Sequence, residues 1–279
     1  MKNLWVILLF CTQLLVAQTY HQFEAGDECY LIADNVNVRA TASTKGDIIA
    51  NVPIGTKVEI VKQSAEKIRL KGFKTNWYKV KFTAEGKEQT GYVWGGLIAE
   101  GAVVCQADGA VLFLYGIERV KTQNKGEYAY NDVELQLRAC KNNQELSKVT
   151  FEGAGMLSIF HGIKNFGSRG VRGVLDVVEI EESQEMCAGI NLYNVVFWDG
   201  KKLSHVIALN PGGDAPYYAS DELIYPSDKK GTRGVIIRDQ QEGYWDEESN
   251  KDVIESHKRV EYIWTETGLK KNKVLIDKK

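Results

Sequence analysis

Short segments in which apolar and polar residues alternate, separated by turn residues, most strongly limit how this chain can fold. Val36 and Val38, for example, alternate with polar neighbours, so one face of a predicted strand is apolar and the other polar. The 279 residues include 26 glycines and 4 prolines, with 13 tyrosines and 6 tryptophans. This composition suits short strands joined by tight turns better than helices. The sequence therefore predicts an all-β protein.

The first part of the chain contains five such strands, with polar or glycine-containing turns between them. They are predicted at Val36–Arg39, Ile48–Val52, Val58–Ile60, Trp77–Phe82 and Thr90–Trp94. An open sheet of this size would leave both edges and one apolar face uncovered. We therefore expect residues 27–100 to form a closed or nearly closed small barrel.

Several motifs of this segment resemble those of bacterial SH3 (SH3b) domains. In chain order they are Asn37-Val38-Arg39, Gly46, Val52, Gly55-Thr56-Lys57-Val58, Trp77-Tyr78-Lys79-Val80 and Gly91-Tyr92-Val93-Trp94-Gly95-Gly96-Leu97. The resemblance implies an SH3-like barrel at or beyond the cell envelope. Some members of this family bind cell-wall peptide or target an attached enzyme, so the resemblance implies a role of this kind. It does not imply a reaction. One departure is Ile68–Thr75, which lengthens the segment before Trp77 and is expected to be an extended hairpin tip.

Aromatic side chains beside the loop after the first strand are the candidates for ligand contact in such a barrel. Flat aromatic faces suit peptide or sugar surfaces and lose little rotamer entropy on binding. The candidates are Trp94, Trp77 and Tyr92, together with Arg39, for which a solvated or structural role is the alternative. Neighbouring strand residues point to opposite faces, so either Trp77 or Tyr78 is expected in the core.

Residues 1–17 are predicted to be a signal peptide. Lys2 gives a positive start, a mainly apolar stretch extends to Val16, and Ala17-Gln18 is a plausible cleavage point. A retained membrane anchor is the less favoured alternative, because the stretch is shorter than the ~20 apolar residues of a spanning helix. Lipid modification at Cys11 is a second less favoured alternative. The mature protein is therefore expected in the periplasm or outside the cell, without a membrane span.

Removal of the leader leaves four cysteines, an even number in a compartment that can be oxidising. They are Cys29, Cys105, Cys140 and Cys187. The first two flank the predicted barrel, whose ends are expected to meet. One hypothesis therefore pairs Cys29 with Cys105 and Cys140 with Cys187. The alternative is free buried thiols, which pack as small hydrophobic side chains.

Residues 101–279 are predicted to form a second β-rich domain that abuts the barrel, because no linker rich in proline, serine or charge separates the two. Hairpin turns are expected at residues 141–144, 199–202 and 265–268. Trp198 and Trp264 each precede a glycine turn and a leucine, which would suit propeller blades. Their separation exceeds the usual blade period, so a β-sandwich-like domain is favoured over a small or partial β-propeller.

Motifs for catalysis or metal binding are not evident in the sequence. No cysteine precedes a helical pattern, as a cysteine hydrolase of the wall-cutting type would require. The acidic run Asp246–Asp252 lacks the glycine and the closing glutamate of a calcium loop, and is expected to be a solvated hairpin tip. His205 alternates within a predicted strand, which suggests a surface or satisfied core histidine. We therefore expect no cofactor, no metal and no enzymatic activity.

The formal net charge of −2 provides no basic excess for phosphate backbones, so nucleic acid is not an expected partner. The leading hypothesis is a non-catalytic exported binding protein whose first domain holds cell-wall peptide, as in peptidoglycan, or an envelope protein. One alternative is a cell-wall hydrolase with an unrecognised active site in the C-terminal region. Another is a structural component of an envelope assembly.

Overall fold

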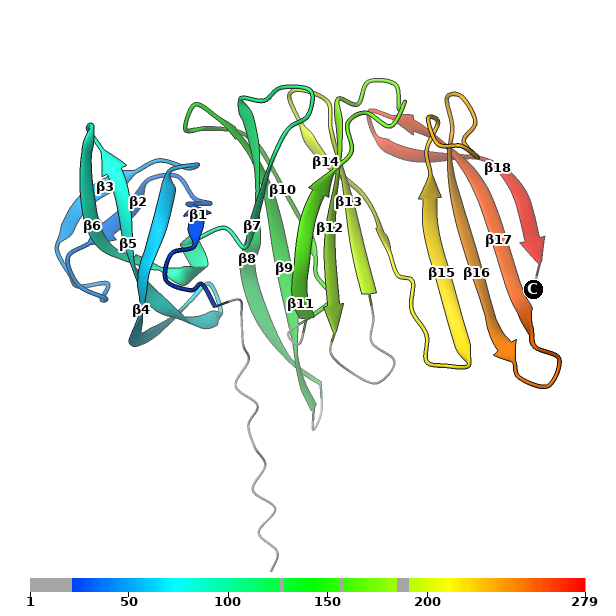
Figure 1. Ribbon diagram of the computed structural model, residues 1–279, viewed down its shortest axis with the longest axis horizontal. Coiled ribbons are helices and arrows are strands. Elements are labelled where there is room, and N and C mark those ends of the chain that lie inside the picture. The colour runs from blue at the N-terminus through cyan, green and yellow to red at the C-terminus, as the bar shows by residue number, and fades with distance from the viewer. Residues whose placement is uncertain (1–21, 126–127, 156–157, 185–190, 279) are drawn as a thin grey trace, which may run out of the picture.

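The chain is all-β in the computed structural model, which describes residues 22–125, 128–155, 158–184 and 191–278. The predicted signal peptide and Cys187 lie outside the described residues. A curled sheet at the N-terminus is followed by three four-stranded antiparallel sheets (Figure 1). The all-β prediction is thus confirmed. Over the same described ranges, no helix is long and apolar enough to cross a bilayer.

The curled sheet is a half-barrel of six strands in the order β1-β4-β5-β6-β2-β3. Its strands are β1 (Glu28–Tyr30), β2 (Val36–Arg39), β3 (Ile48–Val52), β4 (Lys57–Leu70), β5 (Phe73–Ala84) and β6 (Lys87–Trp94), followed by a short 3-10 helix, η1 (Gly95–Leu97). The five strands expected from the sequence are all present, and β1 adds a sixth that pairs with β4.

The interior of the half-barrel is filled by the apolar residues that alternate along its strands. Val36, Val38, Val58, Ile60 and Val80 are all at most 2% exposed and belong to one hydrophobic cluster. Their polar neighbours point to the outside, because successive side chains of a strand point to opposite faces. The period-two pattern of the sequence therefore predicted this core correctly.

The remaining strands form three consecutive meanders, each of which makes one sheet. The first contains β7 (Gly101–Val104), β8 (Val111–Lys125), β9 (Tyr128–Lys141) and β10 (Gln144–Glu152). The second contains β11 (Ser158–Asn165), β12 (Asp176–Gln184), β13 (Asn191–Trp198) and β14 (Leu203–Leu209). The third contains β15 (Tyr217–Ile224), β16 (Ile236–Asp246), β17 (Lys251–Thr265) and β18 (Gly268–Lys278). The three expected hairpin turns connect β9 to β10, β13 to β14 and β17 to β18.

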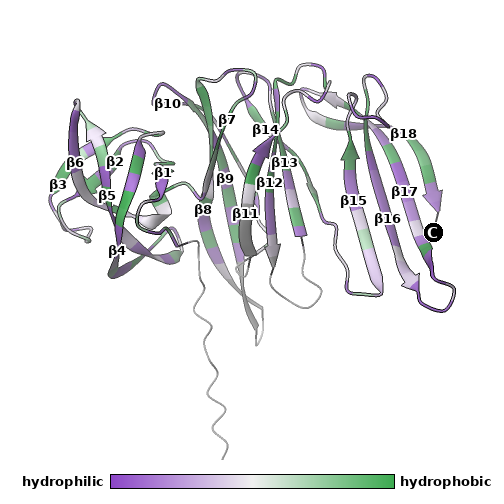
Figure 2. Cartoon of the chain, viewed as in Figure 1, coloured by the Kyte–Doolittle hydropathy of each residue, from purple (hydrophilic) through white to green (hydrophobic). Residues whose placement is uncertain are grey.

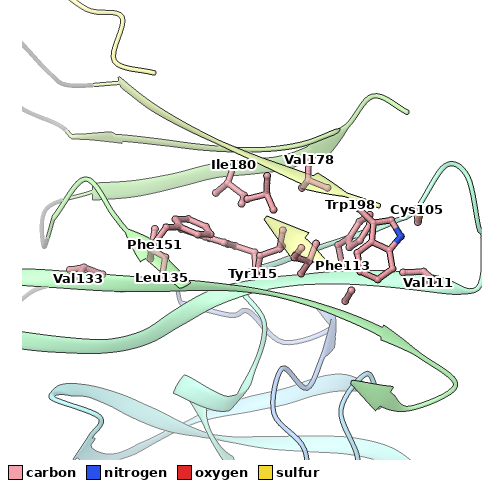
Figure 3. Packing of buried hydrophobic residues seen from close by; sticks show 14 of the residues in the cluster. Cys105, Val111, Phe113, Tyr115, Val133, Leu135, Phe151, Val178, Ile180 and Trp198 are labelled. Carbon is pink, nitrogen blue, oxygen red and sulfur yellow. The ribbon is translucent and has the colours of Figure 1, made fainter. Parts of the chain in front are cut away.

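The middle sheet, β11–β14, buries both of its faces. Val178 and Val196 lie opposite each other and pack in a cluster with the sheet β7–β10 (Figure 3). Their neighbours Val177 and Phe197 also lie opposite each other, and pack in a different cluster with the sheet β15–β18. The face-to-face packing of a sandwich therefore occurs twice, and the second region is a stack of three sheets.

The two tryptophans that share a sequence context occupy matching places in successive sheets. Trp198 ends the third strand of the middle sheet and packs edge-on against Phe113 of the preceding sheet, with ring centroids 5.9 Å apart. Trp264 lies at the end of the third strand of the last sheet and packs edge-on against Phe197, 4.8 Å away. The repeated motif thus marks a repeated four-stranded unit, the same unit that forms the blades of propellers.

The last sheet relies more on polar contacts, and its strands β16 and β17 are largely hydrophilic (Figure 2). The Arg238 guanidinium donates two hydrogen bonds to the carboxylate of Asp221, at 2.7 and 2.6 Å. His257 Nε2 lies 2.8 Å from Asp239 Oδ1 on the neighbouring strand. Such cross-strand pairs keep the strands in register where few large apolar side chains are present.

The half-barrel is fixed to the stack by the long β4–β5 hairpin. The turn residue Lys71 accepts a hydrogen bond at its carbonyl from the Val120 amide of β8, at 2.9 Å. A Cβ atom on the next residue, Gly72, would lie 1.8 Å from the Val120 carbonyl oxygen, so only glycine allows this approach. Ile68–Thr75 is therefore an extended hairpin tip, as expected, and the two parts of the chain abut.

Asp176 is a fully buried carboxylate that links the first and second sheets of the stack. Its Oδ2 accepts hydrogen bonds from the amide of Gln106 at 2.7 Å and from Asn165 Nδ2 at 2.9 Å. Its Oδ1 accepts one from the amide of Gly167 at 2.8 Å. Three donors therefore fulfil the hydrogen-bonding capacity of both carboxylate oxygens. Because these bonds offset the cost of burying the carboxylate, Asp176 stabilises this junction.

Replacement of Asp176 by asparagine should therefore destabilise the protein strongly. The new amide group places N–H donors against N–H donors, and we expect the free energy of unfolding to fall by roughly 2–4 kcal/mol. Urea unfolding followed by tryptophan fluorescence measures this change. The matched variant Asp214→Asn, in an exposed loop, should change the free energy little. Equal stability of the two variants would contradict the linking role of Asp176.

Glu100 lies between the half-barrel and β7, and its Oε2 is buried. Burial raises the pKa of Glu100 from its usual value near 4.5 to about 8. Between these values the folded protein holds a proton that the unfolded chain has released, so stability falls as the pH rises.

The free energy of unfolding should accordingly be lower at pH 8 than at pH 5, and Glu100→Gln should reduce this difference. A reduction of at least about 1.4 kcal/mol, the value of one pKa unit, is expected. Urea unfolding of both proteins at the two pH values provides the measurement. Other buried carboxyl groups are present in both proteins, so their contributions cancel in the comparison. If the free energy of unfolding depended on pH in the same way in both proteins, Glu100 would not titrate as described.

The hypothesis of a disulfide between Cys29 and Cys105 is wrong. Cys29, Cys105 and Cys140 are all free. Cys29 packs against the half-barrel core, whereas Cys105 is buried in the cluster between the first two sheets of the stack. The Cys29–Cys105 bridge is therefore not formed, since each side chain is held in a different core. Cys140 packs in a third cluster. The described residues therefore contain free thiols, as in the alternative, with Cys105 and Cys140 buried and Cys29 half-buried.

Candidate ligand-binding site

The two candidate tryptophans, Trp77 and Trp94, lie directly opposite each other where β5 and β6 pair. Trp94 immediately precedes η1. Trp77 and Trp94 are only 4% and 2% exposed. Trp94 packs on Phe73, with ring centroids 5.0 Å apart, and its Nε1 donates a hydrogen bond to the carbonyl of Ile68 at 3.3 Å. The expectation of exposed aromatic faces is therefore not met, because the extended β4–β5 hairpin covers these rings.

The sequence predicted that one of two neighbours, Trp77 and Tyr78, would be buried, and both are. Tyr78 belongs to the half-barrel core, and its hydroxyl lies 3.1 Å from Gln63 Nε2. Trp77 points to the opposite face, where it joins the cluster shared with the sheet β7–β10. Both faces of β5 are therefore covered at this point. The usual rule of one buried face fails because the second region packs on the outside of the half-barrel.

The edges of these rings line a pocket of about 190 Å³ beside the loop that follows β2. Three of the four candidate residues, Trp94, Trp77 and Arg39, contribute to its wall. The remaining lining residues are Ala33, Asp34, Asn35, Val36, Asn37, Thr44, Leu70 and Leu97. The fourth candidate, Tyr92, is half-buried and pairs with Arg39 across the strands, but does not line the pocket.

Arg39 shapes the pocket through a contact with the backbone. Its Nη1 donates a hydrogen bond to the carbonyl of Gly46 at 2.7 Å, which holds the loop between β2 and β3 against the strand. On the other side, Asn51 Nδ2 donates to the carbonyl of Asn35 at 3.0 Å and to Oδ1 of Asn37 at 2.9 Å. Arg39 therefore combines the structural role considered as an alternative with a place in the pocket wall.

Apart from Arg39, the polar residues of the pocket were not candidates from the sequence. Asp34, Asn35 and Thr44 are exposed and lie in the loops on either side of β2. Asn35 has a φ angle of 53°, a conformation that asparagine adopts more readily than most residues. Asn35 lies directly before an alternating strand, and this position was the signal in the sequence that could have indicated a left-handed turn residue there.

The remaining candidates do not converge on this pocket. His205 stacks on Phe151 with ring centroids 4.8 Å apart, and its Nε2 lies 2.9 Å from Asn194 Oδ1. Burial lowers the pKa of His205. This confirms the expected satisfied core histidine. The acidic run at Asp246 forms the turn between β16 and β17, as expected.

The half-barrel is similar to a known domain family. Residues 34–99 match the family model described as the bacterial SH3 domain, which covers β2–β6, η1 and every residue of the pocket lining except Ala33. Such domains are commonly found in exported proteins and often bind peptidoglycan. None of the curated proteins matches the chain. The family match thus concerns the half-barrel, and the three-sheet stack carries no family assignment from it.

Because Trp94 lies in the core, its truncation should act first on stability. We expect Trp94→Ala to lower the free energy of unfolding by roughly 3–5 kcal/mol, as for other large buried aromatic residues. Trp245, which is 42% exposed, provides the comparison, and Trp245→Ala should cost about 1 kcal/mol or less. Urea unfolding measures both. A Trp94→Ala protein as stable as the Trp245→Ala protein would contradict the packing described above.

Proposed function

We propose that this protein is a non-catalytic binding protein of the cell envelope, whose bacterial SH3 domain holds a short peptide of the cell wall. The observation that carries the proposal is the pocket bounded by Arg39 and Trp94. Its volume of about 190 Å³ is below the ~300–1,000 Å³ of pockets for drug-sized ligands, so it suits one or two residues of a peptide. The nearby amide and hydroxyl groups suit the polar backbone of such a ligand.

The surroundings of the pocket support recognition rather than a reaction. Arg39 is engaged with a backbone carbonyl, and the indole rings are held in packed cores. No cysteine of the described residues lines the pocket, and elsewhere burial raises the pKa of the Cys140 thiol to about 11 and that of Cys29 to about 12, which suits inert thiols better than nucleophiles. In this proposal the three-sheet stack serves as the scaffold that presents the domain, and the predicted signal peptide delivers the protein to the periplasm or beyond.

Thr44 offers a way to test the pocket without damage to the core. It is exposed and lines the pocket, so Thr44→Tyr should fill the space with a neutral ring. We expect this variant to lose at least about tenfold in affinity for purified peptidoglycan sacculi, which corresponds to ~1.4 kcal/mol. Thr90→Tyr makes the same change on the exposed side of β6 and should bind like the unmodified protein. A sedimentation assay with sacculi measures both.

Two results would contradict the proposal. Equal binding of sacculi by the Thr44→Tyr and Thr90→Tyr variants would mean that the pocket does not hold the ligand. Clearing of a cell-wall zymogram by the pure protein would instead favour the hydrolase that the sequence analysis considered.

A further inference from the structure

The strand β3 forms an open edge of the half-barrel. It pairs with β2 on one side, and among the described residues its backbone forms no hydrogen bond on the other. Its sequence, Ile48-Ile49-Ala50-Asn51-Val52, contains no charge and no proline, the two commonest protections of an exposed edge. Ile48 and Ile49 are 54% and 41% exposed. An edge of this kind is a template for pairing with another strand.

A groove of about 730 Å³ lies against this edge. One wall is residues 49–52 of β3, and the facing wall comes from β1, β4, β5 and β6. Val58 and Phe82, which belong to the half-barrel core, contribute its apolar floor. Five residues of β3 span about 17 Å, so the edge can pair with an extended segment of similar length.

The rim of the groove carries an excess of negative charge. Four glutamates and two lysines line it, and both lysines are already engaged in ion pairs. These pairs are Lys57 with Glu28, at 2.7 Å, and Lys81 with Glu59. Glu85 and Glu88, next to the β5–β6 turn, form no ion pair with any other described residue. These two carboxylates, which are held in no described ion pair, line the groove and favour a cationic occupant.

We propose that this groove binds a short extended segment of a partner protein, which adds as a strand to β3 and directs lysine or arginine side chains toward Glu85 and Glu88. Strand addition supplies the backbone hydrogen bonds, and the acidic rim selects basic side chains. The proposal does not depend on the wall-peptide pocket, because the two linings share no residue. Failure at one site therefore leaves the other untouched.

A capped heptapeptide of alternating lysine and valine is the probe. Titration calorimetry of the full chain should show saturable binding, and hydrogen exchange followed by mass spectrometry should show slower exchange at residues 48–52. A peptide with glutamate in place of lysine should not bind. Equal binding of the acidic peptide, or protection of residues 33–44 in place of β3, would overturn the proposal.

Charge-reversing variants test the rim. Glu85→Lys combined with Glu88→Lys should weaken binding of the basic peptide at least about tenfold, or ~1.4 kcal/mol. The matched pair Glu66→Lys with Glu152→Lys, both exposed and outside the groove, should leave binding unchanged. If both double variants lost the same affinity for the basic peptide, Glu85 and Glu88 would have no specific role in binding. Concentration-dependent dimerisation that Ile49→Lys abolishes would assign the edge to a second copy of this chain and also overturn the proposal.

Discussion

The burial of both faces of the middle sheet is the constraint on which the rest of the structure depends. In β12 and β13, consecutive valines pack into different hydrophobic clusters, so β11–β14 requires a sheet on each side. The aromatic pairs Phe113–Trp198 and Phe197–Trp264 fill these two interfaces at matching places. A single meander of this sequence would leave an apolar face in water, at a cost of about 25 cal/mol per Å². The stack of three is therefore a physical requirement of the middle sheet.

The same cluster extends into the half-barrel and explains why its aromatic rings are covered. Phe73, Trp77 and Trp94 share a core with β8 and β9, and the β4–β5 hairpin reaches over them. Here the packing leaves only their edges in a small pocket, and the polar loops around β2 provide the rest of its wall. The packing of the second region thus limits how much of these rings is accessible in the half-barrel.

Local patterns predicted the half-barrel well, because its strands alternate cleanly and its motifs recur in a known order. They predicted less where burial depends on a distant partner. Trp94 was expected at a surface because the sequence does not reveal that sheet β7–β10 packs on this face. Likewise β10, β15 and β18 are rich in polar residues, and their pairing comes from neighbouring strands rather than from their own periodicity.

The order of the sheets along the chain has a consequence for how the molecule is made. Each of the three four-stranded sheets is a meander of consecutive strands, and each packs on the sheet that precedes it. A chain that emerges from its N-terminus can therefore complete the half-barrel first and then lay each new sheet on a surface that already exists. No unit has to wait for a distant segment before its strands can pair, and the entropy of closing long loops is avoided. Assembly can follow synthesis, one layer at a time.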